Sequence, residues 1–238
     1  MTLKLGIVTA LKKEFTTLSS GNYELHKPIQ LTENISGIIS GMGSSNAIQS
    51  ANILKDKYPD MQGIISWGVA AGLTPDLKTG DVVLPRYIIP VGGESAELNN
   101  SLLTSLEQKL SRFFFVKPET SLASTNELLM DATSKKKLHH NTGGQAADME
   151  SGALLEFAQQ NNLSFSAIRT ISDSLDDVIP AAVANYTKED GSVQLWGLLS
   201  EVITNPVQWK QLINIGMNFK KARKRLSVIS EVVLNGDR

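Results

Sequence analysis

The sequence contains no cysteine, has almost no net charge and has no long apolar segment. The 238 residues include no cysteine, which excludes disulfides, zinc–cysteine sites and a thiolate nucleophile. The 23 Lys and Arg nearly balance 24 Asp and Glu, giving a net charge of −1, which argues against a nucleic-acid-binding protein. The longest strongly apolar window, Met61–Pro75, is shorter than the roughly 18–20 residues that span a bilayer. We therefore expect a cytoplasmic protein.

Short apolar runs typical of strands alternate with segments of helical periodicity. Apolar residues recur three or four positions apart over 46–58 and over 151–161, which predicts a helix in each segment. An alternation of strands and helices predicts an α/β fold whose sheet is covered on both faces. The predicted strands are Leu3–Thr9, Ile35–Ser40, Gly63–Trp67, Asp81–Leu84 and Phe165–Ile171.

The last part of the chain has a different character. Residues 174–191 contain several aspartates, a proline and an Asp-Gly pair, which predicts an irregular excursion. Pro206 then opens a long segment of helical periodicity. Its polar face indicates either a solvated surface or a peripheral contact with anionic lipid. The cations on that face are Lys220, Lys221, Arg223, Lys224 and Arg225.

Two glycine-rich segments follow predicted strands. Residues 40–46 close one strand and open a helix, so the free amides around Gly41 and Gly43 suit an anion. Residues 67–72 form a second small-residue segment, predicted as a turn, where Gly68 and Val69 would allow close approach of a ligand. The alternative interpretation is an ordinary structural turn for residues 40–46 and tight helix–strand packing for residues 67–72.

Charged residues gather at two further predicted strand ends. If side chains alternate along the segment Asp148–Ser151, then Asp148 and Glu150 share one face. Arg169 and Asp173 lie at the carboxyl end of the last predicted strand, the end at which α/β sheets collect ligands. A buried structural Arg–Asp pair is the alternative interpretation.

Together these motifs resemble the purine nucleoside phosphorylase and nucleosidase superfamily. The resemblance spans residues 3–177 and implies one domain, 1–238, with a twisted mixed sheet flanked by helices, a C-terminal extension 178–238 with a long helix, and a homo-oligomer. Its motifs are Gly6–Glu14, Ser40–Gly43, Gly68–Leu73, Gly80–Val83, Asp148–Ser151 and Arg169–Asp173.

The tail and Val69 resemble the hopanoid-associated phosphorylase branch, which implies adenosylhopane as substrate. Most nucleosidases have Ser or Thr at the position of Val69, whereas this branch is aliphatic there. The tail motifs are residues 179–182, 188–191 and 205–206, followed by the long helix.

The resemblance also implies roles for individual residues. Glu150 would accept hydrogen bonds from both ribose hydroxyls, and Met149 would pack against the sugar. Asp173 would deliver a proton to the departing purine, a form of catalysis worth roughly 10²–10⁴-fold in rate. Arg169 would steady the site electrostatically or help to hold the nucleophile.

The nucleophile is left open by the sequence. Glu14 matches the glutamate that activates water in nucleosidases. Lys12 and Lys13, together with the amides of residues 41–45, could instead form a site for inorganic phosphate, the one co-substrate considered. No metal and no other cofactor is expected.

The base is assigned by analogy. The segment 124–127 occupies the place of the base-binding loop, so Thr125, Asn126 and Asp148 are candidates for contacts with the purine, and adenine is favoured. We therefore expect release of adenine from a lipid-linked nucleoside, by hydrolysis or phosphorolysis. The alternatives are a methylthioadenosine/S-adenosylhomocysteine nucleosidase and, in a different class, a nucleoside-binding protein without catalysis.

Overall fold

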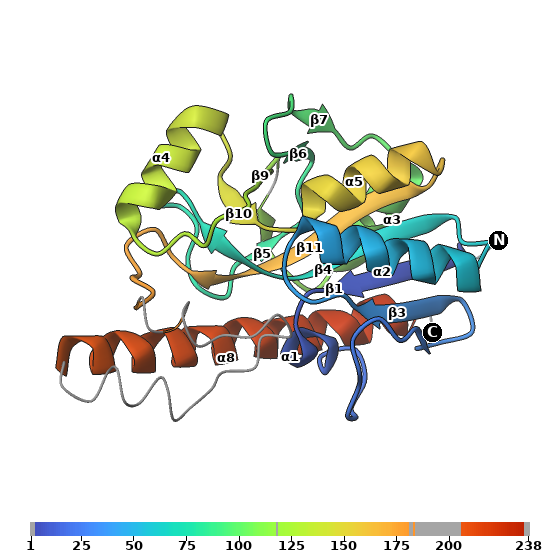
Figure 1. Ribbon diagram of the computed structural model, residues 1–238, viewed down its shortest axis with the longest axis horizontal. Helices are drawn as coiled ribbons and strands as arrows, with labels where there is room; N and C mark the ends of the chain where they lie inside the picture. The colour runs from blue at the N-terminus through green and yellow to red at the C-terminus, as the bar shows by residue number, and fades with distance from the viewer. Residues whose placement is uncertain (1–2, 118, 181–182, 184–205, 236–238) are drawn as a thin grey trace.

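Two parallel ten-residue strands, β4 (Gly63–Gly72) and β11 (Ser164–Asp173), form the centre of the fold (Figure 1). The computed structural model describes residues 3–117, 119–180, 183 and 206–235. The tail-motif residues 181–182, 188–191 and 205 lie outside the described residues. β1 (Leu5–Thr9) lies parallel to β4, and β3 (Ile35–Ile39) lies parallel to β1. β2 (Ile29–Gln30) closes that edge in the antiparallel direction.

The remaining strands extend the sheet at the other end of β4 and beside β11. β10 (Ala146–Asp148) pairs antiparallel with the last residues of β4, and β9 (Ser121–Ser124) and β6 (Tyr87–Ile89) follow in parallel. β7 (Ala96–Glu97) ends this branch, while β5 (Val82–Val83) joins β11 to β8 (Val116–Lys117). Because parallel and antiparallel pairs occur in one sheet, the predicted mixed α/β fold is confirmed.

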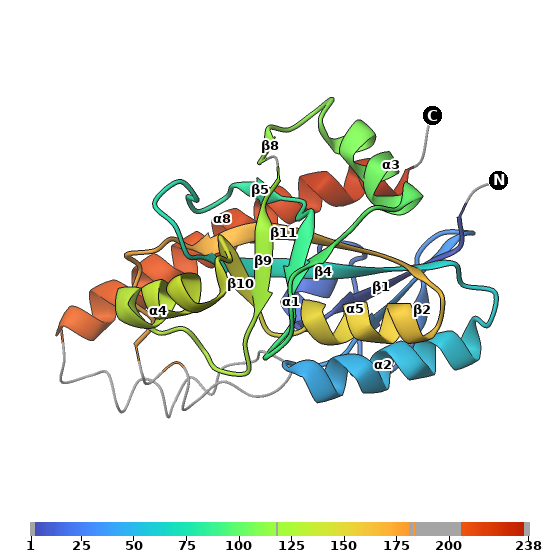
Figure 2. The ribbon, with the colours of Figure 1, turned by 90° about the horizontal axis from the view of Figure 1, so that it is seen from above.

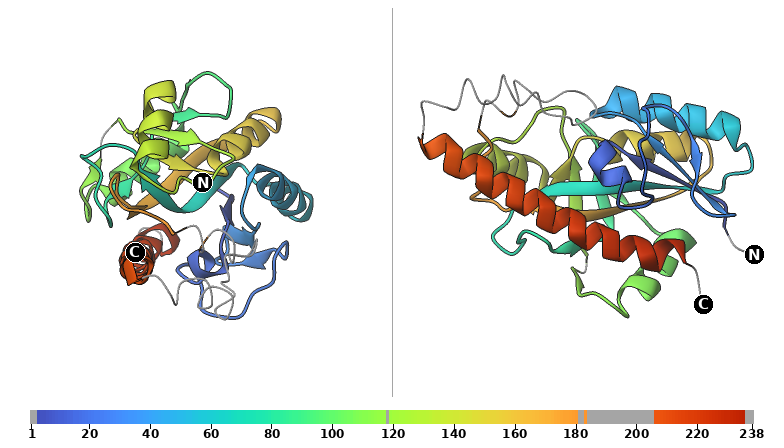
Figure 3. Two further views of the ribbon diagram at one scale, coloured as in Figure 1. Left: turned by 60° about the vertical axis from the view of Figure 1, so that its left-hand side comes forward. Right: turned by 90° about the horizontal axis from the view of Figure 1, so that it is seen from below.

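Helices cover both faces of the sheet. α2 (Ser44–Lys57) and α5 (Ser151–Gln160) lie side by side on one face (Figure 2). The short α1 (Lys12–Phe15) and the 29-residue α8 (Pro206–Leu234) lie on the opposite face (Figure 3), as the periodicity after Pro206 predicts. α3 (Ser101–Leu110) contacts β11 and α8, and α4 (Ala132–Thr142) precedes β10.

The two central strands are longer than the sequence pattern predicts. Residues 68–72 continue β4 and do not form the predicted turn, because β11 pairs with residues 68–71 and β10 joins at Ala71 and Gly72. Ile64, Ile65 and Trp67 are buried in the core. Strands covered on both faces tolerate small residues where neighbouring backbones supply the hydrogen bonds.

α8 is tied to α1 by hydrogen bonds as well as by apolar packing. Arg223 donates from Nε to the carbonyl of Lys13 at 2.6 Å and from Nη2 to Oγ1 of Thr16 at 2.9 Å. Ser230 donates to the carbonyl of Thr17 at 2.6 Å. Arg223 therefore does not belong to the exposed basic surface predicted for this helix, whereas its neighbours Lys220, Lys221, Lys224 and Arg225 are exposed. Among the described residues, no helix has the length and apolar character needed to cross a bilayer.

Candidate active site

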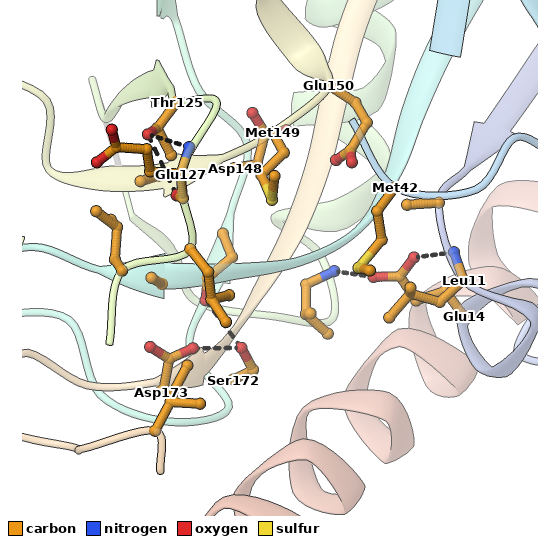
Figure 4. Close-up of a pocket in the computed structure, with 18 residues that line it drawn as sticks. Leu11, Glu14, Met42, Thr125, Glu127, Asp148, Met149, Glu150, Ser172 and Asp173 are labelled. Carbon is orange, nitrogen blue, oxygen red and sulfur yellow. Dashed lines mark hydrogen bonds between the residues drawn. The ribbon is translucent and has the colours of Figure 1, made fainter. Parts of the chain in front are cut away.

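A cavity of about 150 Å³ opens at the carboxyl ends of β1, β4, β10 and β11 (Figure 4). Glu14 and Glu150 lie on one side of it, and Asp173 lies across from them. Most of the lining is apolar, and it includes Thr125, Glu127, Asp148 and Ser172 as further polar residues. The apolar lining residues are Ala10, Leu11, Met42, Val69, Ala70, Ala71, Leu128, Leu129, Ala147, Met149 and Ile179.

Glu14 reaches the cavity from α1, directly after β1. Its Oε1 accepts a 2.8 Å hydrogen bond from the amide of Val69, and its Oε2 accepts a 3.0 Å bond from the amide of Leu11. Burial raises the pKa of the Glu14 carboxyl, while the two amides and the charge of Arg169 oppose the rise. A buried carboxylate with a raised pKa is a better base for water than an exposed one.

Gly68 makes room for this carboxylate. A Cβ at position 68 would lie 2.5 Å from Oε1 and 2.8 Å from Cδ of Glu14, closer than any ordinary contact. The glycine in the middle of β4 is thus explained by the side chain that crosses it. Gly68 and Val69 therefore belong to a strand and not to the predicted turn, and the Val69 amide is bonded to the Glu14 carboxylate.

Glu150 lies at the N-terminus of α5 and reaches across to α2. Its Oε1 accepts a 2.8 Å hydrogen bond from the amide of Gly43, the N-cap of α2. Gly41 and Gly43 have φ values of 86° and 92°, which favour glycine. The free amide predicted at this turn is therefore occupied by Glu150. Burial, followed by the charge of Asp148, raises the pKa of Glu150 to about 8, and the Gly43 amide opposes the rise.

Asp148 is committed to a buried structural pair. Arg169 donates to its Oδ2 from Nε at 3.1 Å and from Nη2 at 2.5 Å, and Ser151 donates to the same oxygen from its hydroxyl. Asp148 also accepts from the backbone amide of Ser151 at the start of α5. Asp148 also lines the cavity, so its predicted contact with the base stays a prediction, while its carboxylate is held by Arg169 and Ser151.

The predicted alternation over 148–151 is also wrong. β10 ends at Asp148, and Glu150 already has the non-extended backbone of a helix cap, so the two carboxylates turn to different partners. The alternative interpretation of Arg169 as part of a buried structural Arg–Asp pair is correct, but its partner is Asp148 and not Asp173.

A second, much smaller cavity lies between Glu14, Glu150 and Arg169. It shares Ala10, Glu14, Val69 and Glu150 with the main cavity. Its volume of about 10 Å³ is enough to hold a water molecule. Neither Lys12 nor Lys13 is among the residues lining the two cavities, so the predicted pair of phosphate-binding lysines does not face them.

Asp173 is presented by a bulge at the end of β11. Ile171 pairs with Ala70 and Asp173 pairs with Ala71, so Ser172 is the extra residue. The Ser172 hydroxyl donates to Oδ1 of Asp173 at 2.7 Å. The ammonium of Lys135, on α4, lies 2.7 Å from Oδ2. Oδ1 of Asp173 therefore accepts a hydrogen bond, whereas Oδ2 has an ion-pair partner, Lys135, and no hydrogen bond among the described residues.

The predicted base loop is only partly at the cavity. Thr125, Glu127, Leu128 and Leu129 line it, whereas Asn126 is exposed and is not among the lining residues. The Thr125 hydroxyl accepts a 3.1 Å bond from the amide of Glu127, which shapes the loop. Among the described residues, no group of three or more His, Asp or Glu lies close enough together to hold a metal ion.

Comparison with known proteins decides the family. The chain matches the family described as the Phosphorylase superfamily over residues 4–194. The chain belongs to the Phosphorylase superfamily. This confirms the predicted superfamily and enzyme class.

Several nucleosidases of this superfamily are similar to the chain. It is 26% identical over 200 residues to the 5′-methylthioadenosine/S-adenosylhomocysteine nucleosidase of Buchnera aphidicola, covering 73% of this chain and 79% of that protein. The futalosine hydrolase of Helicobacter pylori superposes with a TM-score of 0.70 at 16% identity, covering 98% and 97% of the two chains. The 5′-methylthioadenosine/S-adenosylhomocysteine nucleosidase of Neisseria meningitidis, in complex with methylthio-immucillin-A, gives a TM-score of 0.71 at 16% identity, covering 98% and 100%.

Sequence reasoning missed three residues at or beside the cavity, Lys135, Met42 and Leu129. Lys135 sits in a run of three lysines that reads as a solvated surface, and only its i+4 spacing from the N-cap Asp131 could have hinted at a fixed orientation. Met42 and Leu129 carry no sequence signal beyond being apolar, yet both line the main cavity.

Proposed function

We propose that this chain hydrolyses the N-glycosidic bond of an adenine nucleoside. The observation that carries the proposal is the water-sized cavity between Glu14, Glu150 and Arg169, which adjoins the main cavity. Inorganic phosphate has four oxygens around its phosphorus and needs far more space than one water molecule. Water is therefore the nucleophile that these residues suit best.

The reaction needs a base, a sugar holder and a proton donor. Glu14 accepts a proton from water as the water oxygen bonds to the anomeric carbon. The glycosidic bond breaks at the same carbon, its electron pair moves to the purine, and a proton from Asp173 bonds to the ring. Glu150, held by the Gly43 amide through Oε1, accepts hydrogen bonds from the ribose hydroxyls. Met149 packs against the sugar.

The apolar lining supports a nucleoside with an apolar group on the 5′ carbon. We propose a lipid-linked nucleoside of the adenosylhopane type, because Leu128 and Val178, beside the lining residue Ile179, are exposed apolar side chains. Methylthioadenosine and S-adenosylhomocysteine are the second candidate, favoured by the similarity to nucleosidases that carry those names.

Product analysis with purified protein tests these proposals. Methylthioadenosine, S-adenosylhomocysteine and adenosylhopane are incubated with and without inorganic phosphate, and adenine and the sugar product are quantified. We expect adenine with a free ribosyl product, at a rate independent of phosphate. A ribosyl 1-phosphate product would refute hydrolysis. Tight adenosine binding with no adenine release from any substrate would favour the non-catalytic alternative.

A peripheral membrane contact is part of the lipid-linked proposal. The exposed face of α8 combines cations with Met217 and Val228, both exposed, a pattern that suits an anionic lipid surface. Co-sedimentation with phosphatidylserine vesicles should fall when Lys220, Lys221 and Lys224 are changed together to Gln. Arg223 is left intact because it holds α1. Equal sedimentation of both proteins would discard the contact.

The resemblance to the superfamily also implies a homo-oligomer, which we propose for this chain. Sedimentation equilibrium at several protein concentrations measures the mass directly. A mass equal to the 25.8 kDa of one chain at every concentration would refute it.

A further inference from the structure

Lys135 is a completely buried lysine beside the proposed proton donor. Its ammonium lies 2.7 Å from Oδ2 of Asp173 and donates to the carbonyls of Ser174, at 2.7 Å, and of Asp177, at 3.1 Å. Burying an ammonium group is costly unless it is paired and hydrogen-bonded, and Lys135 has both kinds of partner. The burial of the Lys135 ammonium therefore needs an explanation.

The neighbouring lysines show that this burial is specific. Lys136 and Lys137 follow in the same helix and are exposed. The start of α4 is set by Asp131, whose side chain accepts a 2.8 Å hydrogen bond from the amide of Ser134. Because that cap fixes the first turn of the helix, only the first of the three lysines points towards the end of β11.

The three partners of Lys135 belong to one short segment. Asp173 ends β11, and Ser174 to Asp177 form the turn that follows it. The turn is closed by a 2.7 Å hydrogen bond from the amide of Ser174 to the Asp177 carboxylate. One ammonium group therefore connects the carboxylate and the backbone that carries it, and this fixes the direction of Asp173 at the cavity wall.

We propose that Lys135 is a positioning residue for departure of the base. This inference rests on the proposed nucleosidase function. When Asp173 gives its proton to adenine, the O–H bond breaks, an N–H bond forms on the ring, and negative charge is left on the carboxylate. The Lys135 ammonium is already 2.7 Å away and compensates that charge without any rearrangement. The hydrogen bonds from the Lys135 ammonium to the carbonyls of Ser174 and Asp177 hold it in place during this step.

Leaving groups that differ in their need for a proton test this role. Adenine release is compared with cleavage of a 4-nitrophenyl riboside carrying the same 5′ group, because 4-nitrophenolate departs as a stable anion. We expect Lys135→Met to lower kcat for the adenine nucleoside roughly 100-fold. The same variant should retain the 4-nitrophenyl activity to within about 3-fold, and the matched control Lys136→Met should retain both activities.

The ratio of the two rates keeps the test valid if the variant folds poorly. A smaller folded fraction lowers both rates equally and leaves their ratio unchanged. Lys135→Gln, which keeps a donor for the carbonyls of Ser174 and Asp177 but has no charge, serves as the second variant. It should show the same selective loss. Equal losses with both substrates, or no loss with either, would overturn the role of Lys135.

The proposed function and this inference fail in different ways. If the wild-type protein releases adenine from no nucleoside, the nucleosidase proposal is wrong. If the wild-type protein is active and the rate ratio is unchanged in both Lys135 variants, only the positioning role is wrong.

Discussion

Replacing Gly68 with alanine tests the placement of the proposed base, Glu14. The new Cβ would lie 2.5 Å from Oε1 of Glu14, so the carboxylate must retreat by roughly 0.9 Å to reach an ordinary contact of 3.4 Å. That movement stretches the 2.8 Å bond from the Val69 amide beyond hydrogen-bonding range. A 1 Å misplacement of a reacting group costs about 100-fold in rate, so we expect kcat to fall about 100-fold, or roughly 2.7 kcal/mol.

The assay is adenine release under saturating substrate, together with the affinity for adenine. Adenine affinity should change little, because Asp173 and the base loop are on the other side of the cavity. Gly216→Ala is the matched control, because no atom lies within 4 Å of a Cβ built there. The double variant Gly68→Ala/Glu14→Asp should be no slower than Glu14→Asp alone, since the shorter side chain leaves space. Wild-type kcat in Gly68→Ala would refute this account of Glu14.

Three further predictions concern the other site carboxylates and the last helix. Asp173→Asn should collapse adenine release while the circular dichroism spectrum stays that of the wild type, and full activity would reject the assignment of the proton donor. Glu150→Gln should do the same and should also change the pH dependence of stability. Burial raises the pKa of Glu150 to about 8 from an ordinary 4.5. Between these two pH values the folded wild-type protein keeps a proton that the unfolded chain has already lost. Wild-type stability should therefore fall as the pH rises from about 5 to 8 relative to Glu150→Gln, by an amount on the order of a few kcal/mol, and parallel urea-unfolding profiles at pH 5 and 9 would contradict this. Arg223→Gln should lower the free energy of unfolding by about 1 kcal/mol, measured by urea unfolding, because it loses its bonds to Lys13 and Thr16. An unchanged unfolding midpoint would show that apolar packing alone holds α8.

Much of the fold follows from local patterns. Each predicted strand has a counterpart in the sheet, because apolar β-type runs have few other places to go in an α/β fold. The pattern fails over 68–72, where small residues look like a turn. Strand pairing with β10 and β11 is a long-range interaction that local propensity does not contain.

The candidate site, like the fold, is only partly predictable from the sequence. Motif identity and order bring Glu14, Glu150 and Asp173 to one cavity. Which charge pairs with which was not predictable, because the choice depends on distances of about 3 Å between elements far apart in the chain. Arg169 pairs with Asp148, and Asp173 pairs with Lys135. Such pairings are set by the packing of α4 and α5 against the sheet.

The attachment of α8 to α1 has a consequence for synthesis of the protein. The helix that carries Glu14 is held by Arg223 and Ser230, which are synthesised much later than Glu14. Until the segment that forms α8 has been synthesised and has left the ribosome, α1 lacks these partners. A nascent chain can therefore assemble most of its sheet while its proposed base remains unfixed, and the proposed hydrolysis should begin only after α8 has packed against α1.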